Sequence, residues 1–312
     1  MAGKLIIKII IFITLIGVFS FLAMFINPDY DKEYIAGISP KLEKLKSAHG
    51  NKIVIIGGSN GSFGIDSQLM EKKLGVSVVN MALHGGLPLK YVIEQVKEEL
   101  NKGDILILTK EYGGLKSQYW NRMNGIELPK IVTYDLSQIK VLLTDKTLFV
   151  STLTGLFKTI NFNIKRFPFK RRKNLNSVYS INAFYKDNLK AQFLEGSYEK
   201  KISIHTLPKL NVNSKLIESL QYYHGYFKKE GIDFYITPPV IIEGYYDAEQ
   251  LLPFWRYFSN ITNIPLLSNN KPYVLPREYF LNSHYHTNYK GREKRTKSLI
   301  EDIVNSDASI TK

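Results

Sequence analysis

The stretch that decides the fold is residues 51–109, which begins NKIVIIGGSNGSFGIDSQL. Residues 53–56 form a short β-branched run that ends in two glycines, the pattern of a buried strand meeting a tight turn. Residues 76–79 and 105–108 have the character of a second and a third strand. Between them we expect one helix that Asp66 caps and Gly75 ends, and another that Pro88 opens. The order is therefore strand, helix, strand, helix, strand.

This alternation predicts an α/β fold with an open parallel sheet and helices on both faces, which is a doubly wound, flavodoxin-like arrangement. The same signals return later in the chain. We expect a helix from Ser214 to Gly231, a strand over residues 232–236 that the following prolines end, and a last helix over about 291–304. The sequence shows no internal repeat.

The composition indicates a globular protein with a basic surface. The chain has 312 residues, of which 44% are hydrophobic, and a net charge of +14. Such a charge favours polyanionic partners, either nucleic acid, anionic lipid or an acidic polysaccharide. The chain has no cysteine, which excludes a disulfide scaffold, a thiolate zinc site and a cysteine nucleophile.

The N-terminus predicts a membrane anchor. Residues 5–26 carry one charge, Lys8, and as a helix they would reach about 33 Å, enough for a bilayer core. A cleaved signal peptide is the competing interpretation, although no pair of small residues marks a cleavage site. With Lys4 and Lys8 before the apolar stretch, we expect a single-pass protein with a short cytoplasmic N-terminus and an extracytoplasmic domain. Nucleic acid is then not an expected partner.

The chain accordingly divides into a transmembrane signal-anchor (1–27), a juxtamembrane linker (28–50), one α/β domain (51–304) and a tail (305–312). Residues 113–212 form a basic and aromatic insertion with weak periodicity. From Lys146 to Lys186 there are nine basic residues and no acidic one. Two interpretations stay open for this stretch: a solvated, locally mobile insertion, or a surface for anionic lipid headgroups or anionic glycan.

Candidate reactive residues lie where the predicted strands end, the edge at which sites form in open α/β sheets. Ser59 follows the first strand in a glycine-flanked turn, Gly85 follows the second, and His286 precedes the last helix. A serine nucleophile needs a base and nearby backbone N–H donors, and these three residues can supply them. Each has a simpler explanation as well: a plain or phosphate-binding turn at Ser59, a β-to-α turn at Gly85, and a structural role for a single histidine.

Taken together, these motifs resemble the SGNH (GDSL-like) hydrolase superfamily. Its nucleophile block matches Gly57-Gly58-Ser59-Asn60, and its second block matches Asn80 followed five residues later by Gly85. The closer resemblance is to membrane-anchored bacterial proteins that modify cell-surface polymers. That subgroup's motifs are matched here by Phe63-Gly64-Ile65, by His84, and by Tyr285-His286-Thr287-Asn288 with Gly291-Arg292. The resemblance covers residues 51–110 and 230–302, and it implies Ser59 as nucleophile, His286 as base, and the Ser59 and Gly85 N–H groups as oxyanion donors.

Two positions depart from the family pattern. The asparagine that completes the oxyanion hole in the third block is missing, and the third strand runs into Thr109-Lys110-Glu111-Tyr112. The acid that precedes the histidine is replaced by Asn282 and Ser283. An asparagine oxygen can accept from imidazole and orient it, but it does not stabilise the imidazolium as a charge does. Asn60, Asn80, His84, Glu111 and His284 are further candidates for substrate contact or support of the site.

The resemblance implies an extracytoplasmic acyltransferase or esterase that adds or removes O-acetyl groups on a cell-surface glycan. Its partners would be the glycan or an acyl donor and, by resemblance alone, an acyl-loading membrane protein. The alternative is a non-catalytic scaffold or glycan-binding subunit of a surface-polymer assembly, which the two departures favour. No metal or cofactor is expected, since His284 and His286 alone do not make a convincing ligand set.

Overall fold

A computed structural model describes residues 2–25, 34–115, 127–165, 177–210, 214–268 and 272–306 of the chain, excluding the side chains at 2, 13, 20, 21, 23–25, 127, 159 and 161–165. Its centre is a four-stranded parallel sheet in the order β2-β1-β3-β6. The strands are β1 (Lys52–Gly57), β2 (Ser77–Asn80), β3 (Ile105–Thr109) and β6 (Asp233–Ile236). A parallel bridge from Ile236 to Leu266 continues the sheet beyond β6. The prediction of an α/β fold around a parallel sheet is confirmed.

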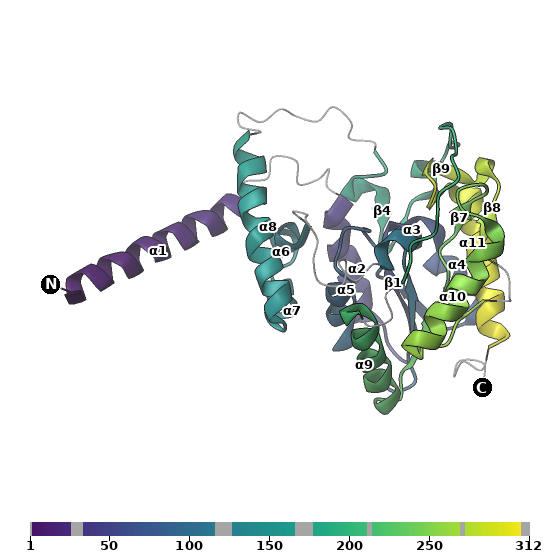
Figure 1. Ribbon diagram of the computed structural model, residues 1–312, viewed down its shortest axis with the longest axis horizontal. Helices are drawn as coiled ribbons and strands as arrows, with labels where there is room; N and C mark the ends of the chain where they lie inside the picture. Colours follow the sequence, from purple (N-terminus) through teal and green to yellow (C-terminus); the bar gives the residue numbers. More distant parts are fainter. Residues whose placement is uncertain are drawn as a thin grey trace.

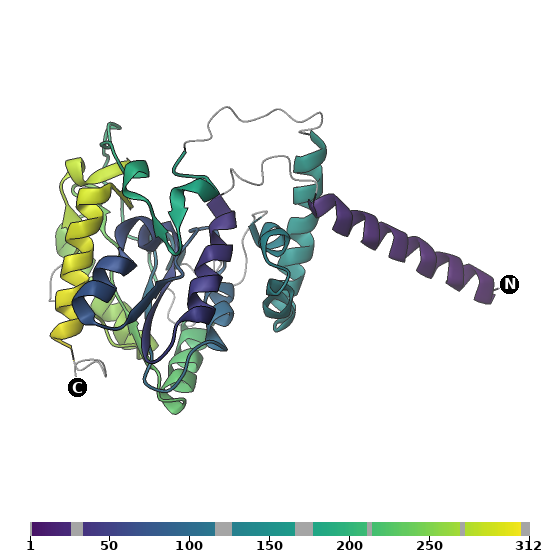
Figure 2. The same cartoon turned by 180° about the vertical axis from the view of Figure 1, so that it is seen from behind.

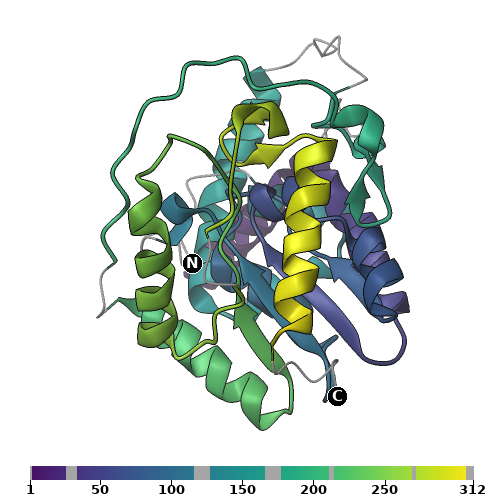
Figure 3. The same cartoon turned by 90° about the vertical axis from the view of Figure 1, so that its right-hand side faces the viewer.

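Helices cover both faces of this sheet (Figures 1 and 3). Val54 and Ile56 of β1 belong to the larger core, which includes buried side chains from α2, α5, α9 and α10. Ile53 and Ile55 point to the opposite face, where α4 and α11 complete a second core. The helices are α2 (Ile38–Ser47), α4 (Ser67–Leu74), α5 (Leu89–Lys97), α9 (Lys215–Lys229), α10 (Ala248–Thr262) and α11 (Tyr289–Val304).

Individual residues determine where α4 begins and ends and how the chain leaves β1. The Asp66 side chain accepts from Leu69 N at 3.1 Å and caps α4, while Gly75 ends that helix in the left-handed conformation that glycine adopts without strain. At the end of β1, Gly57 has φ +152° and a Cβ there would lie 1.7 Å from Thr109 O. Only glycine therefore lets β1 pass so close to β3 before the chain turns into α3 (Ser59–Gly64).

The N-terminal helix α1 (Ala2–Phe25) extends away from the sheet (Figures 1 and 2). Within the part of the chain that the structure describes, no helix combines the length and apolar character needed to cross a membrane.

The segment expected as a linker over residues 28–50 is instead largely part of the domain. A 3₁₀ turn, η2 (Tyr34–Gly37), leads into α2, and both contribute to the main core. Ile38, Leu42 and Leu45 share one helical face and are buried. The linker prediction was wrong for residues 34–47, because this apolar stripe needs the sheet to pack against.

The insertion at 113–212 contains helices that its weak periodicity did not predict. Three of them form a layer beside α1 (Figure 2). They are α6 (Glu127–Tyr134), α7 (Gln138–Leu143) and α8 (Lys146–Lys165). A short antiparallel hairpin, β4 (Phe184–Tyr185) and β5 (Asn188–Leu189), then returns to the main domain. The basic run 170–173 lies outside the described residues, as do 307–312 of the tail.

The remaining elements are short. They are η3 (Tyr112–Leu115), η5 (Ile181–Ala183), η6 (Ala191–Phe193), β7 (Ile241–Ile242), β8 (Val274–Leu275), η7 (Arg277–Tyr279), β9 (Phe280–Ser283) and β10 (His286–Thr287). Strands β9 and β10 pair as an antiparallel hairpin immediately before α11.

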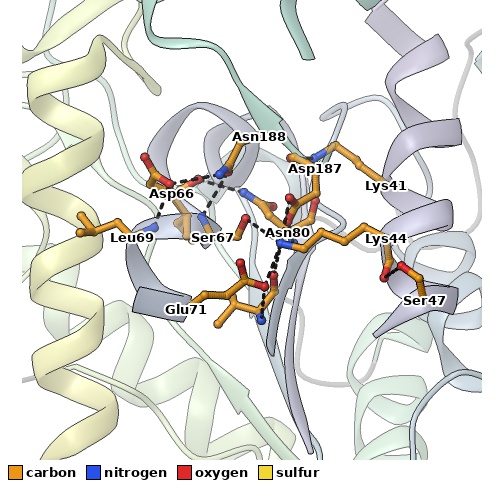
Figure 4. A network of polar contacts seen from close by, with 12 residues as sticks. Lys41, Lys44, Ser47, Asp66, Ser67, Leu69, Glu71, Asn80, Asp187 and Asn188 are labelled. Atoms are coloured by element: carbon orange, nitrogen blue, oxygen red, sulfur yellow. Dashed lines mark hydrogen bonds and ion pairs between the residues drawn. The ribbon is translucent and has the colours of Figure 1, made fainter. Parts of the chain in front are cut away.

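A buried polar network fastens the insertion hairpin to the sheet (Figure 4). Asp187, in the turn between β4 and β5, accepts from Asn80 N at 2.7 Å and pairs with Lys44 at 3.1 Å. Lys41, fully buried on α2, donates to Asn80 O and Asp187 O at 2.6 Å each. Burial lowers the pKa of Lys41 to about 7. The network places the end of β2, and with it the loop to Gly85, against α2 and the insertion.

Candidate active site

The carboxyl edge of the sheet gathers four segments. Ser59 begins α3 directly after β1, Glu111 follows β3, and the loop with Gly85 follows β2. The β9–β10 hairpin reaches the same edge from the C-terminal side, because β10 packs against α3. Thr287 of this hairpin fixes the contact by donating to Phe63 O at 2.7 Å. Residues that lie more than 220 positions apart in sequence are thus brought to one place.

Ser59, His286 and Asn282 form a continuous hydrogen-bonded line. His286 Nε2 lies 2.9 Å from Ser59 Oγ, and His286 Nδ1 lies 2.9 Å from Asn282 Oδ1. An amide oxygen only accepts, so Nδ1 carries the proton toward Asn282 and leaves the Nε2 lone pair for the serine hydroxyl. This is the tautomer that a general base for Ser59 requires. Asn282 itself is exposed, whereas the imidazole is half-buried.

Two aromatic rings hold the imidazole in place. Phe63 stacks on His286 with centroids 4.0 Å apart and an interplanar angle of 7°. The Tyr179 hydroxyl lies 3.3 Å from His286 Nδ1. Burial lowers the pKa of His286 to about 4, against the opposing effect of the nearby Glu111 charge. The ring is therefore neutral, and able to accept a proton, throughout the neutral pH range.

The other side of Ser59 carries a carboxylate. Glu111 Oε1 accepts from Asn60 N at 3.1 Å and from Ser59 Oγ at 3.3 Å. A Cβ built on Gly58 would lie 2.3 Å from Glu111 Oε2, and one built on Gly85 would lie 3.4 Å from Oε1. The carboxylate thus fills the space between the two glycines, beside the serine oxygen. This is the space in which oxyanion donors would be expected.

Lys110 connects this side of the site to the loop after β2. Its fully buried ammonium donates to Gly85 O at 3.0 Å and lies 3.8 Å from Glu111 Oε2. Burial lowers the pKa of Lys110, while the Glu111 charge acts in the opposite direction. Lys110 was not among the sequence candidates, and it fixes the position of the predicted oxyanion glycine.

The other sequence candidates support the loops rather than approach Ser59 Oγ. Asn60 donates from Nδ2 to Thr109 Oγ1 at 2.8 Å. Asn80 donates to Gly61 O and Ile65 O and accepts from Ala82 N, which ties α3 to the end of β2. His84 accepts from Gly86 N at 3.0 Å.

His284 lies apart from the serine–histidine line. It stacks on Tyr245 with centroids 3.8 Å apart, and His205 stacks on the same tyrosine at 4.4 Å. Burial lowers the pKa of His284 to about 4. This three-ring stack shapes the turn that separates β9 from β10.

Tyr179 was missed by the sequence reasoning. It comes from the insertion, where no motif or periodicity marks it, and it reaches His286 only through the tertiary fold. Phe63 had a signal, since it belongs to the Phe-Gly-Ile string, but its ring contact did not follow from that string.

In comparisons with known proteins, no family model matches the chain, and no curated protein matches it.

Proposed function

We propose that the chain is an SGNH-type serine enzyme that transfers or hydrolyses an acyl ester of a cell-surface glycan. The single observation that carries this proposal is the line from Ser59 through His286 to Asn282, with both hydrogen bonds at 2.9 Å. The proposal requires a doubly wound, flavodoxin-like sheet. In support of it, the parallel sheet has the order β2-β1-β3-β6 with a further bridge to Leu266, and helices cover both faces.

In this reaction Ser59 Oγ attacks the acyl carbonyl while His286 Nε2 takes the hydroxyl proton. The tetrahedral intermediate then collapses, His286 returns the proton to the leaving alcohol, and the acyl group stays on Ser59. A sugar hydroxyl or water, deprotonated by the same histidine, accepts the acyl group and frees the serine. Backbone N–H groups of Ser59 and Gly85 would stabilise the oxyanion, which requires that the Glu111 side chain turn away from the space between Gly58 and Gly85.

The position of the Glu111 carboxylate beside Ser59 Oγ favours a second candidate function, a non-catalytic scaffold or glycan-binding subunit. A carboxylate cannot donate to an oxyanion, and its charge opposes the charge that develops in acyl transfer. The Ser59 hydroxyl has one proton, so a bond to Glu111 competes with the bond to His286. The shorter distance to His286 favours the productive partner.

We also propose that residues 5–26 anchor the protein in a membrane, with the short N-terminus in the cytoplasm and the domain outside. In support, α1 is helical over Ala2–Phe25, and the described side chains Leu5, Phe12, Leu15 and Phe19 are exposed. Burying such a surface in lipid removes the cost of exposing it to water.

A fluorophosphonate probe tests the enzyme proposal directly. Attack by Ser59 Oγ forms an oxygen–phosphorus bond and releases fluoride, so the wild-type chain should become covalently labelled. Ser59→Ala should not be labelled, while Ser47→Ala, an exposed serine on α2, should behave as wild type. Labelling that persists in Ser59→Ala would show that the serine assignment is wrong. A folded wild type that resists the probe would favour the scaffold.

A further inference from the structure

The helical layer of the insertion exposes apolar side chains on two of its helices, α7 and α8. On α8 the exposed residues Phe149, Val150, Leu153 and Phe157 follow helical spacing and share one side. On α7 and just before it, Leu136, Ile139 and Leu143 are exposed in the same way. Phe157 is 68% exposed and Leu143 is 60% exposed. We call these seven residues the α7–α8 face. Exposed apolar patches of this kind mark an interaction surface.

The opposite sides of the same helices are already used. Leu142 of α7 and Leu148 of α8 are buried in the main core, together with Leu128 and Ile131 of α6. Helix α7 also packs on α5 of the domain. The layer is therefore fixed to the domain by its buried side. The α7–α8 face lies on the other side, so the layer cannot also bury it against the domain.

The short connection to α1 places this layer near the point where the anchor ends. Nine peptide steps separate Phe25 from Tyr34, so the buried start of the domain lies within about 30 Å of the end of α1. Residues of η2 contact α6, and α1 itself contacts α6 and α8. The part of the domain closest to the membrane is thus the helical layer.

The orientation and the charge of the layer fit a bilayer surface. In Figures 1 and 2 the axis of α1 crosses that of α8, so a helix α1 that spans a bilayer leaves α8 running along its surface. Helix α8 itself carries Lys146, Lys158 and Lys165 and no acidic residue. Phenylalanine and leucine on one face with lysines nearby are typical of helices that lie in the interface of an anionic membrane.

We propose that the α7–α8 face lies in the headgroup and upper acyl layer of an anionic lipid bilayer, beside the entry point of α1. This proposal rests on the anchor part of the proposed function, and it is independent of the chemistry at Ser59. It gives the domain a second attachment to the membrane. With α1 alone the domain could rotate relative to the bilayer, whereas two attachments fix its orientation.

The cysteine-free chain allows a direct test with single-cysteine variants of the full-length protein. Leu153→Cys and Phe157→Cys probe the α7–α8 face, Leu15→Cys probes α1, and Tyr222→Cys is the matched control, being 64% exposed on α9. Each variant is labelled with an environment-sensitive fluorophore and reconstituted in vesicles of phosphatidylcholine and phosphatidylglycerol. Half of the vesicles carry a nitroxide quencher high on the acyl chain.

The expected result is several-fold stronger quenching at Leu153→Cys and Phe157→Cys than at Tyr222→Cys. The proposal is overturned if these two labels are quenched no more than the Tyr222→Cys label while the Leu15→Cys label is quenched. Oxidative dimerisation through Phe157→Cys, with its label unquenched, would likewise overturn it and assign the face to a second copy. Quenching at 153 and 157 without quenching at 15 would support the surface and show that the anchor proposal is wrong.

Discussion

The two sides of Ser59 differ in what they offer a reaction. On one side, His286 is stacked, neutral and bonded at both nitrogens, with a proton acceptor aimed at the serine. On the other side, Glu111 places a negative charge between Gly58 and Gly85. For the proposed acyl transfer, the first side has the geometry that a base requires, and the second has a charge that opposes an oxyanion. Nucleophile activation and oxyanion stabilisation are therefore separate parts of the proposal, and variants can test each.

The largest expected effect is on the histidine side. His286→Ala removes the base whose Nε2 lies 2.9 Å from Ser59 Oγ, and turnover of a chromogenic acyl ester should fall by about 10³-fold. Ser59→Ala should do the same, and the double variant should lose no more than either single one, because the two residues act as a unit. If His286→Ala keeps wild-type turnover, the base lies elsewhere and Glu111 is the next residue to test.

The next largest effect is expected on the carboxylate side. Glu111→Gln removes the charge and offers an N–H donor near the oxyanion, so turnover should rise by up to about 10²-fold. Glu111→Ala is the control, since it removes the charge without adding a donor, and it should give a smaller gain. Steady-state kcat/KM on the same ester measures both. A loss of activity in Glu111→Gln would instead show that the carboxylate takes part in the chemistry.

A smaller effect is expected at the residue that orients His286. Asn282→Ala frees the imidazole, and turnover should fall by about 10–100-fold, or about 1.4–2.8 kcal/mol of transition-state stabilisation. Asn282→Asp keeps the acceptor and adds a charge, so it should preserve or raise turnover and raise the pKa of His286. NMR titration of the ring measures that pKa. If Asn282→Ala matches wild type, the ring is held by Phe63 and Tyr179 instead.

The smallest expected effect is that of pH near neutrality. Because burial lowers the pKa of His286 to about 4, the neutral base is present at higher pH and is lost only as the pH falls through that value. The kcat/KM of the wild type should therefore change by less than about twofold through this ionisation between pH 6 and 8. A sigmoidal decline centred near 6.5 would show that the ring is as accessible to water as a free histidine.

The sequence predicted those parts whose signals are local. Short β-branched runs, the Asp66 cap and the Gly75 stop were sufficient to place β1, α4 and β2, and all three are confirmed. Ser59 and His286 could be paired because each follows a recognisable strand end or precedes a recognisable helix. The structure brings them together, although their catalytic roles stay predictions.

The parts that were missed depend on tertiary partners. The helix α8 has polar and β-branched residues throughout, and its packing depends on α1, α6 and α7, which contact it in the folded chain. The buried face of α2 looked like a linker because Lys41 and Lys44 interrupt it, and their acceptors come from residue 80 and residue 187. The sequence could not predict that Glu111 lies between Gly58 and Gly85, because both glycines are distant from it along the chain and only the fold brings them together.

The bonds of Asp187 have a consequence for the order in which the chain acquires its structure. The Asn80 N–H and the Lys41 ammonium find their acceptors 107 and 146 residues further along the chain. Contacts at such separations close large loops and raise the contact order, which slows folding. Until residue 187 has been synthesised, the Asn80 N–H has only water as a partner, and Lys41 lacks one of the two carbonyl acceptors that it has in the folded protein. The end of β2 and the loop to Gly85 therefore take their final positions only after Asp187 is in place. The line from Ser59 to His286 and Asn282 must wait for a still later part of the chain.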